Sequence, residues 1–90
     1  MMVKKIEYSN YFLKVMKRLP DDIQKIVARK EELFRINPLH PSLRLHELHG
    51  RYVGVWSISV TRGYRIIFER QSDGGILFLS VGSHDIYKYL

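Results

Sequence analysis

The fold of this 90-residue chain is decided by residues 56–68, which read WSISVTRGYRIIF. Residues 56–60 alternate between apolar and small polar side chains, as on a strand whose side chains point to opposite faces in turn, and residues 64–68 supply Tyr64, Ile66 and Phe68 as apolar partners. Residues 61–63 form a three-residue loop that ends in glycine, the residue that best accepts a positive φ angle. The stretch therefore predicts two antiparallel strands, 52–60 and 64–70, joined by a hairpin loop.

A third strand over residues 76–82 follows the turn sequence SDGG. The register that matches apolar residues across both hairpins pairs Val60 with Tyr64 and Phe68 with Leu79. It predicts a core face made of Trp56, Ile58, Val60, Tyr64, Ile66, Phe68, Leu79 and Val81. It leaves an open face, small and polar around one arginine, made of Ser57, Ser59, Arg65, Ile67, Ser80 and Gly82.

The first part of the chain predicts a strand and two helices. Residues 3–8 are expected to form the strand, and Ser9 caps a helix whose apolar residues recur at helical spacing. Pro20 interrupts that helix and opens a second one, which Pro38 ends. Two amphipathic helices joined at a proline are the natural cover for the apolar face of the sheet.

The expected fold class is therefore α+β, with an N-terminal strand and a helical hairpin packed on a mainly antiparallel twisted β-sheet. Residues 43–48 are expected to add a short strand, and residues 84–90 a short C-terminal tail. A chain of this length forms one domain, which we place at residues 1–90.

The composition bounds the class of protein. No cysteine is present, so disulfides and thiolate metal sites are excluded. A net charge of +6 favours an anionic partner, nucleic acid or an acidic protein, with a merely soluble basic surface as the alternative. No apolar run approaches the roughly 20 residues of a membrane span, and the N-terminus has no signal-peptide core. We therefore expect a cytoplasmic protein with no membrane partner.

Arg65 and His84 carry most of the functional argument. The register places Arg65 on the open face opposite Ser59 and Gly82, and it places His84 diagonal to Arg65, at the roughly 7–8 Å spacing of such neighbours. Arginine donates two parallel hydrogen bonds to a phosphate, and histidine exchanges a proton near neutral pH. An ordinary surface or ion-paired arginine is the alternative, with about equal support.

Two further histidines, His46 and His49, lie in the sequence LHELHG. Side chains three residues apart on a strand point to opposite faces, so these two do not form the His-Glu-x-x-His zinc helix, and we expect no metal site. His46 is a candidate second proton-transfer group on the open face, with a loop-edge histidine as the alternative. Tyr87, in the tail, either stacks on RNA bases or packs on the sheet edge.

The order of these elements resembles the RelE/ParE toxin superfamily of type II toxin–antitoxin systems, nearest its YafQ and YoeB branches. The resemblance covers nearly the whole chain, and its most specific parts are Leu45-His46-Glu47-Leu48 with Gly50, Gly63-Tyr64-Arg65 and Gly82-Ser83-His84. It implies a RelE-like fold and a ribosome-dependent mRNA endoribonuclease that requires no metal or other cofactor. It also implies three partners, which are a cognate antitoxin, the ribosome and mRNA in the ribosomal A site.

The resemblance also implies roles for individual residues. By position, Arg65 matches the arginine that binds the scissile phosphate, His84 the general acid, and His46 a histidine that contributes to activity and is our first choice of general base. The remaining expected RNA contacts are Tyr87, His49 and Arg62. Ser59 and Gly63 stand where the YafQ branch has a histidine and an aspartate. Two alternatives therefore stay open: a ParE-like toxin that poisons DNA gyrase by protein contact, and a catalytically decayed module that binds only an antitoxin.

Overall fold

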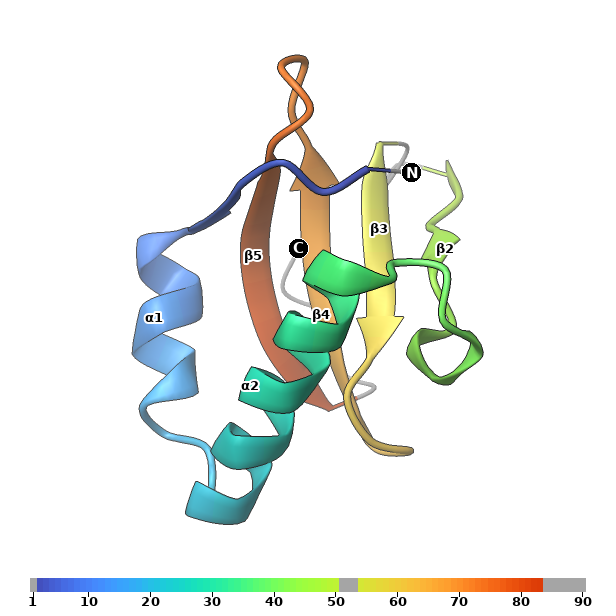
Figure 1. The fold of residues 1–90 in the computed structure, drawn as a ribbon. Helices are drawn as coiled ribbons and strands as arrows, with labels where there is room; N and C mark the ends of the chain where they lie inside the picture. Colours follow the sequence, from blue (N-terminus) through green and yellow to red (C-terminus); the bar gives the residue numbers. More distant parts are fainter. Residues whose placement is uncertain (1, 51–53, 84–90) are drawn as a thin grey trace.

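The structure is a computed structural model that describes residues 2–50 and 54–83, and Figure 1 shows its fold. Five strands form one sheet in the order β1-β5-β4-β3-β2, in which β1 runs parallel to β5 and the other neighbours are antiparallel. The elements are β1 (Ile6–Tyr8), α1 (Asn10–Met16), α2 (Asp21–Ile36), η1 (Pro41–Leu43), β2 (His46–Glu47), β3 (Val55–Ser59), β4 (Tyr64–Arg70) and β5 (Ile76–Ser83). The expected α+β class, with a mainly antiparallel sheet, is confirmed.

Helix α1 begins where the sequence predicts, at the cap residue Ser9. The Ser9 Oγ accepts a hydrogen bond from the Phe12 backbone N–H at 2.9 Å and donates one to the Leu79 carbonyl at 2.8 Å. One side chain therefore satisfies a free N–H at the helix start and also ties the helix to β5. Pro20 precedes α2, and Asp21 and Asp22 occupy its first turn, where the helix dipole favours negative charge.

Both helices cover the same face of the sheet (Figure 1). Their buried residues pack with the inward side chains of the strands in one core cluster: Phe12, Val27, Phe34, Ile58, Ile66, Phe68, Phe78 and Val81. Four phenylalanine rings form its centre, with centroid separations between 5.1 and 6.3 Å. This helix-covered face is the core face that the sequence predicts.

A tyrosine on β1 also links the sheet to the helix layer. The Tyr8 hydroxyl donates a hydrogen bond to the Glu31 carboxylate on α2, and Arg35 contacts that carboxylate at 3.0 Å. The Tyr8 ring stacks on Phe12 and meets Phe78 edge to face. Short strand β1 is therefore held by side chains as well as by its ladder with β5.

The register of the first hairpin is the predicted one. Ile58 faces Ile66, and Ser59 faces Arg65. In the second hairpin Arg65 faces Gly82, also as predicted.

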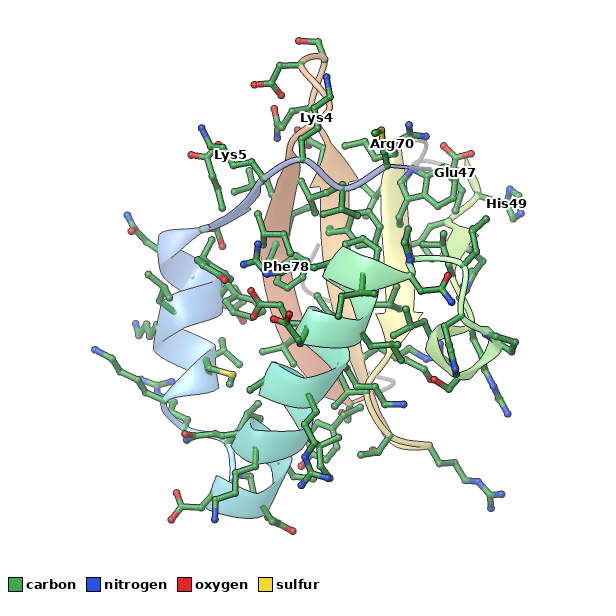
Figure 2. The ribbon with its side chains drawn as sticks, in the orientation of Figure 1. Lys4, Lys5, Glu47, His49, Arg70 and Phe78 are labelled. Atoms are coloured by element: carbon green, nitrogen blue, oxygen red, sulfur yellow. The ribbon has the colours of Figure 1, made fainter. Side chains whose placement is uncertain are left out.

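A β-bulge changes the register of the second hairpin beyond this point. The ladder shifts between Ile67 and Phe68, so Phe68 faces Phe78 and not the predicted Leu79. Phe78 points toward the helices (Figure 2), whereas Leu79 packs with Ile67 on the opposite face. The prediction that Leu79 belongs to the core face is wrong because β5 carries one extra residue at this point.

The face opposite the helices also differs from the expectation. It is small and polar in part, as predicted, but it is not open. Ser57, Ser59 and Ser80 are only 0%, 8% and 4% exposed. Leu48, Val55, Ile67 and Leu79 form a second hydrophobic cluster. We refer to this face, which carries Ser57, Ser59, Arg65 and Ser80, as the buried polar face. The sequence predicted that it would be open to solvent.

Strand β2 is shorter than the predicted strand 43–48. Pro41 begins the 3-10 turn η1, which buries Leu43, and Arg44 follows with a φ angle of +47° in the left-handed region. A proline start and a left-handed end are incompatible with extended backbone, so only His46 and Glu47 pair with β3. The predicted tail, 84–90, lies outside the described residues.

Candidate functional site

Arg65 lies in the middle of β4 on the buried polar face. Its neighbours across the ladder are Ser59 on β3 and Gly82 on β5, so small residues flank the guanidinium on both sides. Its Nη1 atom is buried and makes no hydrogen bond with any described residue. Most buried nitrogens of this kind have a partner, and an arginine keeps its charge at every physiological pH. The arrangement suits an anion that accepts hydrogen bonds from the guanidinium.

His46 lies on the same face as Arg65, at the outer strand of the sheet. Its Cα partner is Ser57, which neighbours Ser59 along β3, and its side chain is exposed. The His46 Nδ1 lies 3.0 Å from the Arg44 carbonyl oxygen. A carbonyl only accepts hydrogen bonds, so Nδ1 carries a proton, and in the neutral form of the ring Nε2 is then the acceptor. His46 can therefore accept a proton at Nε2.

The spacing of the sheet sets how far His46 lies from Arg65. Strand β3 separates β2 from β4, which corresponds to about 10 Å between the two backbones. Their partners on β3, Ser57 and Ser59, are two residues apart, so the two residues are also offset by about 7 Å along the strands. No hydrogen bond joins the two described side chains, but both lie on one face, with the serines of β3 between them.

The other predicted site residues lie at the rim or beyond the described part of the chain. His49 is exposed at the outer edge beyond β2 (Figure 2), and Arg62 is exposed in the loop between β3 and β4. Neither shares the buried polar face with Arg65. His84 and Tyr87 lie outside the described residues, so the expected pairing of His84 with Arg65 stays a prediction. In the described part of the chain, no group of three His, Asp or Glu residues could hold a metal ion.

The structure also shows a pocket that the sequence analysis missed. It has a volume of about 280 Å³ and lies at the end of β3, where α2, the segment 42–44 and the loop after β3 meet. Its polar lining residues are Lys30, Ser42, Arg44, Ser59, Thr61 and Arg62. These residues are far apart in the sequence, and no local motif connects them. We refer to this site as the basic pocket.

Comparisons with solved structures give the same fold. A YafQ structure from E. coli strain BL21(DE3) matches with a TM-score of 0.73 and 23% identity, over 93% of this chain and 97% of that chain. The YoeB/ParE toxin from Agrobacterium tumefaciens matches with a TM-score of 0.73 and 14% identity, over 90% and 99%. An archaeal RelE–RelB complex from Pyrococcus horikoshii OT3 matches with a TM-score of 0.71 and 16% identity, over 91% and 96%. At these identities the similarity shows the fold alone.

Sequence comparison identifies the family. No protein of curated function matches the chain at a significant level. Among the described residues, no helix is long and apolar enough to cross a membrane. A family model, described as the ParE toxin of type II toxin–antitoxin systems, matches residues 6–86 and thus nearly the whole chain. This match confirms the resemblance seen in the sequence, and the chain belongs to the ParE toxin family of type II toxin–antitoxin systems, within the RelE/ParE superfamily.

Proposed function

We propose that this toxin is an endoribonuclease that cleaves mRNA, with Arg65 binding the phosphate at which the strand is cut. The observation that carries the proposal is the buried Arg65 Nη1, which makes no hydrogen bond with any described residue. Leaving a buried charged donor without a partner costs about 1–3 kcal/mol or more. A phosphate that accepts two parallel hydrogen bonds from the guanidinium would remove this cost on binding.

The proposed reaction is attack of a ribose 2′-OH on the adjacent phosphorus. His46 Nε2 accepts the 2′ proton, a bond forms between the 2′ oxygen and phosphorus, and the bond from phosphorus to the 5′ oxygen breaks. His84 gives a proton to the departing 5′ oxygen, and the product is a 2′,3′-cyclic phosphate. Arg65 stabilises the negative charge that builds on the phosphate oxygens during the attack. The role of His84 rests on its place in the sequence, two residues after Gly82, which faces Arg65.

The proposed partners follow from the family and from the charge. Solved relatives include the DinJ–YafQ toxin–antitoxin complex from E. coli, and we propose that this chain likewise binds a cognate antitoxin. The net charge of +6 would favour the phosphate-rich ribosome, where mRNA in the A site is the proposed substrate. Such a substrate places the protein in the cytoplasm.

A second candidate function is inhibition of DNA gyrase. The description of the matching family, ParE toxin, is the observation that favours it. A toxin that acts by protein contact needs no phosphate ligand at Arg65, so this candidate leaves the unpaired Nη1 without a role. A module that binds only the antitoxin leaves it without a role as well.

One experiment separates these candidates. Wild-type toxin, Arg65→Ala and His84→Ala are each induced in cells, while growth is followed and primer extension is run on a translated reporter mRNA. Arg70→Ala is the matched control, because Arg70 lies on the same strand but contacts Trp56, on the helix-covered face. We expect codon-phased cleavage by wild type and Arg70→Ala, with loss of at least 100-fold in the other two variants, as is typical for groups that act on the transition state.

Three results would contradict the proposal. One is toxicity that survives both the Arg65 and His84 changes. Another is inhibition of supercoiling by purified gyrase with no mRNA cleavage, which would establish the ParE-like activity instead. The third is absence of both activities with antitoxin binding retained, which would identify a decayed module.

A further inference from the structure

The basic pocket gathers positive charge without a negative partner. Lys30, Arg44 and Arg62 line it, and no acidic residue is among its described lining residues. None of these three cations forms an ion pair with a described residue. Three cations that face one concave site without a counter-charge repel one another and raise the local concentration of anions. The pocket is therefore attractive to an anionic ligand.

Hydrogen bonds fix two of the polar groups of the basic pocket, those of Lys30 and Thr61. The Lys30 Nζ donates to the Ser42 Oγ at 3.2 Å, which holds the ammonium at the pocket wall. The Thr61 Oγ1 accepts hydrogen bonds from the backbone N–H groups of Gly63 and Tyr64, both at 3.2 Å. With these acceptor positions used, the Thr61 hydroxyl keeps its own hydrogen to donate. The pocket therefore presents donors from a threonine hydroxyl and three cations to one ligand.

The backbone at Arg44 is also unusual. Arg44 has a φ angle of +47°, and it is the one residue other than glycine with a positive φ in the described part of the chain. This conformation costs a non-glycine residue about 1 kcal/mol or more. It holds Arg44 at the junction of η1 and β2, where its side chain lines the pocket.

We infer that the basic pocket binds a backbone phosphate of a single RNA strand, separate from the phosphate at Arg65. The link between the two sites is Ser59, which faces Arg65 across the β3–β4 ladder and also lines the pocket. A strand of RNA that contacts both sites would pass Ser59. A volume of about 280 Å³ is sufficient to admit a phosphate group.

This inference rests on the proposed function, because it assumes that RNA lies against the Arg65 face. An acidic peptide would also be attracted by three cations. RNA is favoured here because Ser59, which lines the pocket, is the cross-strand partner of Arg65, whose buried Nη1 donor has no described partner. The antitoxin is treated as an alternative outcome of the test.

The test removes the three pocket cations together. The variant Lys30→Gln, Arg44→Asn, Arg62→Gln keeps polar side chains, and asparagine tolerates the left-handed backbone at position 44. The matched control, Lys14→Gln, Lys17→Gln, Arg18→Gln, removes the same charge from exposed residues at and just after α1.

Binding of the full chain to a fluorescent single-stranded RNA with 2′-O-methyl riboses is measured by anisotropy at several salt concentrations. The blocked 2′ oxygen prevents cleavage, so binding is read independently of catalysis.

We expect the pocket variant to bind this RNA at least tenfold more weakly than the control variant. The slope of log affinity against log salt should become shallower by about 0.7, the value for one phosphate contact on a single strand. Titration with inorganic phosphate alone, followed by the amide NMR signals of Ser42 and Thr61, distinguishes the source of the phosphate. Weak binding of the free ion, in the millimolar range, and far tighter binding of RNA support a strand-binding pocket.

Three results would overturn the inference. Equal loss of RNA affinity in the pocket and control variants would show a general charge effect. Loss of antitoxin affinity with RNA binding unchanged would assign the pocket to the antitoxin. Binding of inorganic phosphate as tight as that of RNA would make it a site for the free ion. If the triple variant fails to fold by circular dichroism, Arg62→Gln alone, in an exposed loop, is compared with Arg18→Gln.

The RNA-binding test of the basic pocket and the mRNA-cleavage test of the proposed function can fail independently. If wild type binds RNA through the pocket and cleaves no mRNA, the nuclease proposal fails and the pocket stands. If cleavage depends on Arg65 while the pocket variant binds like the control, the nuclease proposal stands and the pocket inference fails.

Discussion

The two faces of the sheet are built from alternate residues of the same strands, yet they differ in chemistry. The helix-covered face is apolar, with Ile58, Ile66 and Phe68 fully buried. The buried polar face combines a small hydrophobic cluster with serines and Arg65, and both Ser57 Oγ and Arg65 Nη1 on it lack a described hydrogen-bond partner. The difference indicates that one face supplies most of the stability, while the other accepts a loss of stability to keep polar groups available.

The largest expected effect tests the apolar side of this comparison. Phe68→Ala removes a fully buried ring that contacts Phe34 and Phe78, and we expect it to lower the free energy of unfolding by about 3–5 kcal/mol. Ile67 directly precedes Phe68 and lies on the other face. We expect Ile67→Ala to lower the free energy of unfolding by about 2–3 kcal/mol, because its hydrophobic cluster is smaller. Urea denaturation measures both values, and equal losses would show that the two faces contribute alike.

A smaller effect of opposite sign is expected on the buried polar face. Arg65→Met removes a guanidinium whose buried Nη1 has no described hydrogen-bond partner, and it puts an apolar side chain in its place. We expect the free energy of unfolding to stay the same or rise by up to about 2 kcal/mol, because the desolvation cost of the charge disappears. Toxicity should be lost in the same variant. If urea denaturation shows that the free energy of unfolding falls by more than about 1 kcal/mol, the guanidinium stabilises the fold. The two faces would then not differ in the way described above.

The smallest effect concerns pH and the link between β1 and α2. Burial, and then the hydrogen bond to Glu31, raises the pKa of the Tyr8 hydroxyl above its usual value of 10.0. The folded protein therefore holds this proton more tightly than the unfolded chain, so the contribution to stability is complete below pH 10 and is lost as the pH rises through the folded pKa. We expect stability to decline above pH 10 in wild type and less steeply in Tyr8→Phe. Tyr11→Phe, which changes an exposed tyrosine on α1, should leave the decline as it is in wild type.

The sequence predicts strand register correctly where the pattern of apolar residues is compatible with one register only. In residues 56–60 apolar and polar residues alternate, and matching this apolar set to Tyr64, Ile66 and Phe68 gives the register that pairs Ser59 with Arg65. In β5 the adjacent residues Phe78 and Leu79 are both apolar, and alternation does not decide which of them faces the helices. The bulge resolves this choice through packing with Phe12 and Phe34, which are far away in the sequence.

The candidate site was predictable to a smaller extent. The register placed Arg65 on the face opposite the core, because parity along a strand is a local property, and His46 was one of two open interpretations for the same face. The burial of that face was not predictable, since it depends on how Leu48 and Val55 pack against Ile67. The basic pocket combines cations from α2, the start of β2 and a loop, so only the folded chain brings them together. The roles of His84 and Tyr87 stay predictions.

The pairing of β1 with β5 has a consequence for the order in which the chain folds during synthesis. Ser9 and Leu79 are joined by a hydrogen bond across 70 residues, and β1 has β5 as its only strand neighbour in the described sheet. Both helices therefore leave the ribosome well before the strand that completes their hydrophobic partner face. Contacts of such long sequence separation form late in folding. The sheet on which both helices pack is therefore complete only after β5 has been translated.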